Sequence, residues 1–415
     1  MIYFFSFARM IAKYKSYLLQ AIFLLATAAG YSQKDTIMLR EVPEEKQIIV
    51  GAEQTDQYLP LIKNRSVAIV ANPTSLIQKT HLVDSLVSLK IKIGCVFAPE
   101  HGFRGDAGAG EEIKNSVDAK TGIPLISIYG NHMKPSREEL KNIEWVIFDI
   151  QDVGARFYTY ISTLQYVMEA CAENNIPLLI LDRPNPNGYY VDGPVLQKKF
   201  SSFVGINPIP IVHGLTVGEY AEMLLGEKWL KDSLQCKIKI VKCVNYDHNS
   251  FYRLPVKPSP NLPDMTSVYL YPSLCLFEGT IISVGRGTSY PFQAIGYPGF
   301  SEGDFSFTPV SIAGVVKNPP YENKECKGFD LREFGEEYVK NYKGLYLFWL
   351  KAFYDSAPDK SKFFTDFFNK LAGTDQLQKQ IKEGWSEEKI KESWQPGLKK
   401  YKQVRKKYLL YRDFE

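Results

Sequence analysis

The feature that most constrains the fold is an alternation of apolar runs and amphipathic segments between about residues 50 and 250. Short, almost purely apolar runs are typical of strands that are buried on both faces. The alternation predicts an α/β fold, a Rossmann-like domain with a mostly parallel sheet. The predicted strands are 66–71, 92–98, 124–129, 144–150, 177–182 and 208–212, and the predicted helices are 81–90, 137–143, 161–175 and 216–227.

Polar loops rich in Gly and Pro follow five of these strands. Ligands bind beyond the carboxyl ends of the strands in an open parallel sheet, so we expect these loops to meet along one edge and to form an active site. The candidate residues in and beside these loops are Asn72, Glu100, His101, Arg104, Asp149, Asp152, Arg156, Tyr158, Tyr160, Arg183, Asn185 and His213.

Glu100 is the first candidate for a catalytic group, because it follows a buried strand and Pro99. Partial burial raises the pKa of a carboxyl group and suits it to general-acid catalysis. Asp149 and Asp152 stand three residues apart at a strand end, and either could supply the second carboxylate of a glycosidase. Structural roles remain open: Glu100 could cap a helix or pair with Arg104, and the aspartates could accept hydrogen bonds from loop amides.

Four arginines could hold a carboxylate on the substrate, since a guanidinium binds a carboxylate through two hydrogen bonds. Tyr158 and Tyr160 alternate along the chain, so both would face the same side of an extended segment. They could stack on a sugar ring or pack in the core. The four arginines are Arg104, Arg156, Arg183 and Arg286.

Several catalytic motifs are absent from the sequence. There is no G-x-G-x-x-G after the first strand and no P-loop, so we expect no nucleotide cofactor, and no other cofactor is indicated. The lack of G-x-S-x-G disfavours a serine hydrolase, and HExxH does not occur. A metal site formed by His101, Asp149, Asp152 and His213 remains an alternative, because imidazole and carboxylate groups could converge there.

The second half of the chain has a different pattern. Residues 255–310 contain many Pro, Gly and aromatic residues without alternation, and residues 330–415 have helical spacing up to a break at Pro396 and Gly397. Proline ends or kinks a helix, so we expect the last helix to stop there. The pattern predicts a catalytic domain over 50–258 and a smaller α+β domain over 259–415.

Two stretches of the predicted second domain are expected to close a cleft between the domains. Residues 259–263 are rich in Pro and residues 276–288 are rich in Gly, and we expect both stretches to form rigid loops. They contain Asn261, Glu278 and Arg286 as isolated Asn, Glu and Arg residues. Clefts between domains are preferred locations for ligands.

The first 32 residues are typical of a secretory signal peptide. Arg9, Lys13 and Lys15 precede an apolar run that is too short to span a membrane, and small residues follow it. The chain has 50 Lys and Arg against 46 Asp and Glu, so removing these three charges leaves it near neutrality. We therefore expect an exported protein, periplasmic or secreted, without a membrane span after cleavage and without a nucleic-acid partner.

Six strings of residues occur in the order of one known family: APEHGFRG (98–105), FDIQDVGARFYTY (148–160), LDRPNPNG (181–188), DGPVL (192–196), PSPNLP (258–263) and CLFEGT with GRGTSYPF (275–292). From about residue 50 to the C-terminus the chain resembles the NamZ-type exo-β-N-acetylmuramidases. The resemblance implies a Rossmann-like domain, a smaller C-terminal domain and an active cleft between them. It also implies hydrolysis that releases terminal N-acetylmuramic acid from the non-reducing end of peptidoglycan fragments.

The resemblance implies Glu100 as the catalytic acid, from the EHGFRG string. The chain departs from the family pattern at Asp192 and Val284, where the pattern has Glu. If the Glu expected at 284 were the second catalytic carboxylate, then Glu278, Asp149 and Asp152 would be the candidates to replace it. The other positions that the resemblance assigns to the site are Asp152, Arg156, Tyr158, Tyr160, Arg183 and Asn185.

The leading hypothesis is an exo-acting β-N-acetylmuramidase of cell-wall turnover, which acts on peptidoglycan-derived muropeptides and disaccharides. An arginine would bind the lactyl carboxylate of N-acetylmuramic acid. One alternative is a metal-dependent hydrolase or deacetylase of envelope polysaccharides, which a chelator would inactivate. The other is a non-catalytic peptidoglycan-binding protein, which would bind the same fragments without turnover.

Overall fold

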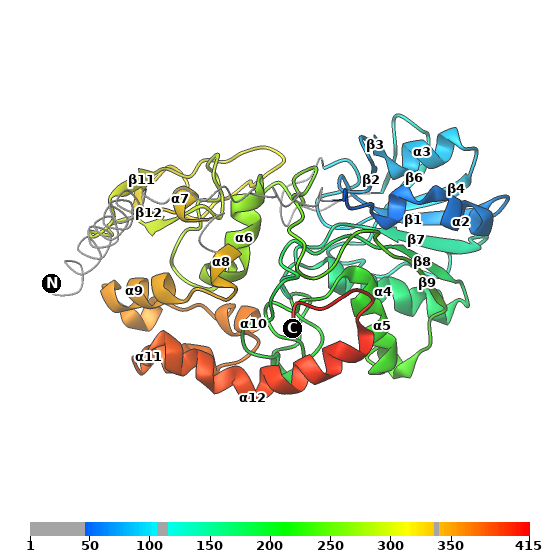
Figure 1. Cartoon of the computed structure of the whole chain (residues 1–415). Helices are drawn as coiled ribbons and strands as arrows, with labels where there is room; N and C mark the ends of the chain where they lie inside the picture. The colour runs from blue at the N-terminus through cyan, green and yellow to red at the C-terminus, as the bar shows by residue number, and fades with distance from the viewer. Residues whose placement is uncertain (1–45, 106–114, 336–339) are drawn as a thin grey trace, which may run out of the picture. The chain divides into compact units, whose positions relative to one another are not determined.

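The computed structural model describes residues 46–105, 115–335 and 340–415. The predicted signal peptide lies outside these residues. A seven-stranded sheet forms the scaffold of the first half, in the order β5-β6-β4-β1-β7-β8-β9 (Figure 1). All neighbouring pairs are parallel except β5 with β6. The strands are β1 (Ser66–Ala71), β4 (Lys92–Ala98), β5 (Ser116–Val117), β6 (Pro124–Ser127), β7 (Trp145–Asp149), β8 (Leu178–Leu181) and β9 (Ile238–Val241).

The central strand β1 is apolar along its length because helices cover both faces of the sheet (Figure 1). Its alternate residues divide between two cores. Val67 and Ile69 pack with α2 (Thr55–Ile62) and α3 (Leu82–Ser88), in a core that contains Tyr58 and Leu86. Ala68 and Val70 belong to a second core, which includes residues of α4 (Tyr160–Glu173) and α5 (Val217–Gly226). The period of two in a strand therefore supplies both layers.

The second half contains a long helical segment and a small antiparallel sheet, in the order β10-β12-β11. Contacts between Cα atoms place Gln47–Glu415 in one compact unit. In the described ranges, no helix has both the length and the apolar character that a membrane crossing requires. The remaining elements are β2 (Leu76–Ile77), β3 (Thr80–His81), α6 (Met265–Leu274), β10 (Ala294–Tyr297), β11 (Phe305–Phe307), β12 (Cys326–Asp330), α7 (Arg332–Phe334), α8 (Lys340–Tyr342), α9 (Phe348–Ser356), α10 (Phe368–Ala372), α11 (Gln376–Lys382) and α12 (Glu387–Arg405).

Three predicted elements were wrong. Residues 208–212 form a buried loop, in which Val212 makes isolated bridges to Ala155 and Asp192, and the last parallel strand is β9. The predicted helix 137–143 is a series of turns. The last helix continues through Pro396, because Trp394 and Tyr401 lie in the core and their packing outweighs one lost hydrogen bond.

Polar contacts join the two halves. The Tyr401 hydroxyl of α12 donates to the carbonyl oxygen of His213 at 2.7 Å, and the Nε of Arg405 donates to that of Gly214 at 2.8 Å. The Nη2 of Arg156 donates to the carbonyl oxygen of Leu371 at 2.8 Å. The loops that follow the sheet are therefore fixed against the helices of the second half.

Candidate active site

A pocket of about 190 Å³ lies where the loop after β4, the start of α4 and the loops of the second half meet. It is lined by residues from both halves of the chain. Seven of the predicted site residues line it: Glu100, His101, Tyr158, Tyr160, Asn261, Glu278 and Arg286.

Glu100 reaches the pocket from a tight turn at the end of β4. The amide of Gly102 donates to the carbonyl oxygen of Pro99 at 3.0 Å, and His101 has a φ of 71°. A left-handed backbone is uncommon for a residue with a side chain, and such strain is concentrated at functional sites. The strand β4 ends at Ala98, and the turn that follows places Glu100 at the pocket.

Two hydroxyl groups hold the carboxylate of Glu100. The phenol of Tyr129 donates to Oε1 at 2.9 Å, and the Thr159 hydroxyl contacts Oε2 at 3.2 Å. Burial, first, and then the negative charge of Glu100 raise the pKa of the Tyr129 phenol well above its usual value. Tyr129 therefore keeps its proton near neutral pH and is a hydrogen-bond donor to Oε1.

Glu278 is the second carboxylate that lines the pocket, and it forms an ion pair with Arg286. The Nη1 of Arg286 lies 2.7 Å from Oε1 of Glu278, and the two side chains are 22% and 24% exposed. The thiol of Cys275 lies 3.5 Å from Oε2 of Glu278. Arg286 is held at the pocket but still faces solvent there.

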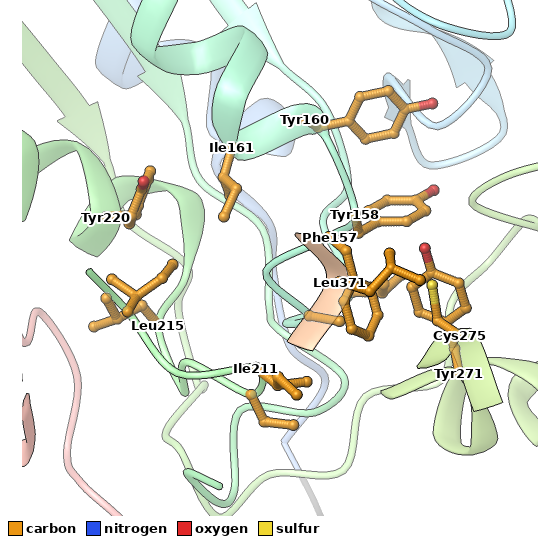
Figure 2. Packing of buried hydrophobic residues seen from close by; sticks show 14 of the residues in the cluster. Phe157, Tyr158, Tyr160, Ile161, Ile211, Leu215, Tyr220, Tyr271, Cys275 and Leu371 are labelled. Atoms are coloured by element: carbon orange, nitrogen blue, oxygen red, sulfur yellow. The ribbon is translucent and has the colours of Figure 1, made fainter. Parts of the chain in front are cut away.

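Aromatic side chains form one wall of the pocket. Tyr158 and Tyr160 point the same way, and Tyr271 lies beside Tyr158 (Figure 2). The ring centroids of Tyr158 and Tyr160 are 5.0 Å apart, and those of Tyr158 and Tyr271 are 5.8 Å apart. The Tyr158 hydroxyl donates to the carbonyl oxygen of Pro258 at 2.7 Å. Tyr160 begins α4 and does not lie on an extended segment. Both tyrosines therefore belong to the core and to the pocket at once.

The two predicted catalytic aspartates lie outside the residues that line the pocket. Asp149 is fully buried, and Arg183 donates to both of its carboxylate oxygens, at 2.6 and 2.9 Å. Oδ2 of Asp152 accepts the amide of Gly154 at 2.6 Å, and His213 Nε2 lies 3.5 Å from the same oxygen. Asp149 thus fixes the loop that follows β8, and Asp152 fixes the loop that follows β7.

Two of the predicted arginines are also occupied elsewhere. Arg104 contacts Asp84 at 3.0 Å and Asp118 at 2.8 Å, and its hydrogen bonds hold the pKa of Asp118 well below the usual range. Arg156 is buried, and within the described part of the chain it donates to the carbonyl oxygens of Pro194, Ile209 and Leu371. These guanidinium groups stabilise loops, whereas that of Arg286 faces the pocket.

The remaining candidates also make structural hydrogen bonds. The side-chain oxygen of Asn72 accepts from the amide of Thr74, and Asn185 donates to the carbonyl oxygen of Leu215. His213 Nδ1 accepts the amide of Leu215 at 3.2 Å. None of the three lines the pocket, and they keep the loops after β1, β8 and residue 212 in place.

Two family models match the chain in succession. The N-terminal model of exo-beta-N-acetylmuramidase NamZ matches residues 67–266, and the C-terminal model matches residues 269–411. The chain belongs to the NamZ exo-β-N-acetylmuramidase family. It is 38% identical over 375 residues to the peptidoglycan beta-N-acetylmuramidase NamZ of Bacillus subtilis (strain 168), across 85% of this chain and 89% of that protein.

The fold is similar to two crystal structures of DUF1343 family proteins from Bacteroides fragilis NCTC 9343. One has a TM-score of 0.83 at 46% identity and covers 88% of this chain and 99% of the other. The second has a TM-score of 0.72 at 26% identity and covers 89% and 100%. The predicted fold class, a mostly parallel α/β sheet followed by a smaller α+β part, is confirmed.

Both positions at which this NamZ family member departs from the expected pattern are buried. Asp192 accepts the backbone amides of Gly193 and Leu345, at 2.7 and 2.8 Å, and the indole of Trp394 at 3.0 Å. Val284 is 3% exposed within the apolar core. Asp192 therefore attaches α12 to the loop that precedes residue 196.

The residues proposed for a metal site do not gather around one point. Asp149 is occupied by Arg183, while Asp152 and His213 lie beside each other. His101 lines the pocket. Among the described residues, no group of three or more His, Cys, Asp or Glu side chains is arranged to hold a metal ion.

Nine residues that line the pocket were not predicted as site residues, and Tyr129, Thr159 and Phe203 are among them. Tyr129 follows β6, the one predicted strand whose following loop was not considered, and Thr159 stands inside the FDIQDVGARFYTY string. Phe203 lines the opening from a turn that is closed by Ser202 and Gly205. The position of Tyr129 at a strand end was the available signal, because β6 pairs with the strand that precedes Glu100.

Proposed function

We propose that this protein is an exo-acting β-N-acetylmuramidase, a glycoside hydrolase that releases N-acetylmuramic acid from the non-reducing end of peptidoglycan fragments during cell-wall turnover. Family membership supports the reaction and the substrate class. The relative in Bacillus subtilis is named for the same activity. One observation carries the proposal for the site: a single pocket contains the hydroxyl-bound carboxylate of Glu100 and the guanidinium of Arg286.

Glu100 is assigned the role of the general acid. Because Tyr129 donates to Oε1, the proton of the carboxylic acid is placed on Oε2, beside Thr159. Oε2 then gives this proton to the glycosidic oxygen as the bond from that oxygen to C1 of the sugar breaks. A water molecule supplies the new oxygen on C1 and releases its second proton to solvent. After the transfer, both hydroxyls donate to the new carboxylate and stabilise its charge.

Arg286 is assigned the role of binding the lactyl carboxylate of N-acetylmuramic acid. It is the member of the four candidate arginines that lines the pocket, since the other three are bound to buried partners. A guanidinium can grip a carboxylate through two of its donors while a third remains on another group. Glu278 occupies Nη1 and so orients the remaining donors toward the ligand.

Export is part of the proposal, with a signal peptide over residues 1–32 and a periplasmic or secreted enzyme. Its substrates would be muropeptides or disaccharides outside the cytoplasm. Mass spectrometry of the N-terminus of protein recovered from the periplasm or medium tests this directly. A mature chain that retains residues 1–32 would contradict it.

The deciding experiment measures release of free N-acetylmuramic acid from a chromogenic β-N-acetylmuramide and from its β-linked disaccharide with N-acetylglucosamine. Wild type is compared with Glu100→Gln, which we expect to lower kcat by about 10²- to 10⁴-fold. The exposed Glu138→Gln is the matched control and should retain full activity. Wild type that releases no sugar contradicts the proposal, and loss of activity in EDTA would favour the metal-dependent alternative.

A further inference from the structure

Asn261 occupies a rigid turn at the edge of the pocket. The amide of Leu262 donates to the carbonyl oxygen of Ser259 at 3.1 Å, and Pro260 restricts the backbone within this turn. Next to it, the Tyr158 hydroxyl donates to the carbonyl oxygen of Pro258 at 2.7 Å. Asn261 is 5% exposed and lines the pocket together with Glu100. Its side chain therefore has a fixed position beside the proposed general acid.

The orientation of the Asn261 amide is set by a carbonyl group. Its Nδ2 donates to the carbonyl oxygen of Val315 at 3.2 Å, and a carbonyl oxygen can only accept. The opposite orientation would place two oxygens against each other. The side-chain oxygen Oδ1 is thus turned away from Val315, and within the described part of the chain this buried atom has no hydrogen-bond partner.

A buried acceptor without a donor is costly, so such an atom on a residue that lines a pocket points to a donor supplied by a ligand. Arg286 lines the same pocket and has a buried donor, Nε, without a hydrogen-bond partner in the described ranges. Leu262, Tyr271 and Phe292 add apolar surface to the same pocket. The complementary ligand therefore carries an N–H or O–H group, an acceptor and a small apolar group.

N-acetylmuramic acid carries these groups on neighbouring carbons. The acetamido group at C2 has an N–H donor and a methyl group, and the lactyl ether at C3 has a carboxylate. We infer that Asn261 Oδ1 accepts the N–H of the 2-acetamido group, with the acetyl methyl packed on the apolar wall. Asn261 is then a specificity-determining residue for 2-acetamido sugars. The inference rests on the proposed function and adds the residue that recognises C2.

The test removes only the N–H. A chromogenic β-N-acetylmuramide is compared with its analogue in which the 2-acetamido group is a 2-O-acetyl ester, which keeps the carbonyl and methyl groups. We expect wild type to prefer the acetamide by about 10- to 100-fold in kcat/KM, since the ester leaves Oδ1 unpaired. Asn261→Ala should lower this preference to about threefold or less.

The preference is a ratio measured on one enzyme preparation, so partial loss of folded protein does not change it. Asn261→Ser gives a second variant, and the exposed Asn249→Ala is the matched control that should keep the wild-type ratio. Equal hydrolysis of both glycosides by wild type, or a full preference retained in Asn261→Ala, would overturn this inference while the muramidase proposal stands. If wild type hydrolyses neither glycoside, the proposed function falls and this inference falls with it.

Discussion

Two carboxylate–arginine ion pairs in this protein differ in how far they are buried. Asp149 and Arg183 form a two-point pair whose side chains are 0% and 2% exposed. Glu278 and Arg286 meet through one short contact at the pocket, and about a quarter of each side chain is exposed. The first pair has no open side for a ligand, whereas the second does. In these two pairs, burial and not residue type decides whether the guanidinium is open to a ligand.

Breaking the buried pair should have the largest effect on stability. Asp149→Asn leaves the charge of Arg183 buried without its counter-ion, and we expect the free energy of unfolding to fall by about 3–5 kcal/mol. Urea denaturation measures it, with the exposed Asp355→Asn as the matched control. A loss below about 1 kcal/mol would show that the buried pair behaves like a surface pair.

Changing the pocket pair should affect binding instead of stability. Arg286→Lys keeps the positive charge but loses the fork of donors, so we expect KM for a chromogenic β-N-acetylmuramide to rise about tenfold or more. The same glycoside with its lactyl carboxylate converted to an amide should show little change between wild type and variant. An equal loss on both glycosides would argue that Arg286 does not bind the carboxylate.

Asp182 extends the comparison because it is a buried carboxylate that, among the residues the structure describes, accepts hydrogen bonds without a paired cation. Burial raises its pKa to about 6, although Tyr411, Gly218 and Thr216 donate to it. The protonated form is favoured in the folded state, so this contribution is fully present below about pH 4 and is lost as the pH rises through about 6.

We expect wild type to gain about 1–2 kcal/mol over Asp182→Asn as the pH is lowered from 7 to 5. Urea denaturation of both proteins at several pH values gives this difference. Parallel pH dependence of the two proteins would contradict the assignment to Asp182.

Tyr129→Phe should have the smallest effect. Without the phenol, Oε1 of Glu100 loses the hydrogen bond that fixes its position. We expect kcat on a chromogenic β-N-acetylmuramide to fall severalfold, because the acid is less well placed for proton transfer. Tyr166→Phe, outside the pocket lining, is the control. An unchanged kcat in Tyr129→Phe would show that the phenol does not position Glu100.

The sequence predicted the elements whose signal is local. Strands 66–71 and 92–98 were located to the residue, because continuous apolar runs need no tertiary information. Strand β9 was missed because its burial alternates with exposed Lys239, while the apolar run 208–212 is a buried loop. Glu100, Asn261, Glu278 and Arg286 were named from local loop composition, and all four line the pocket.

The rest of the site depends on contacts between distant segments. Tyr129 meets Glu100 only because β6 lies beside β4. The guanidinium of Arg156 donates to the carbonyl oxygen of Leu371, which lies 215 residues further along the chain. No local pattern distinguishes such an arginine from Arg286, so which arginine meets a ligand could not be deduced from spacing.

The enclosure of Arg156 also has a consequence for protein engineering. A chimaera that takes residues from 269 onward from another family member must supply a carbonyl group where Leu371 now accepts from Arg156. It must also supply a Tyr401 hydroxyl and an Arg405 guanidinium for the loop at His213 and Gly214. Replacement of a single pocket loop, such as 259–263, leaves these hydrogen bonds unchanged. Exchange of short loops is therefore the practical route to altered sugar preference, and exchange of halves is not.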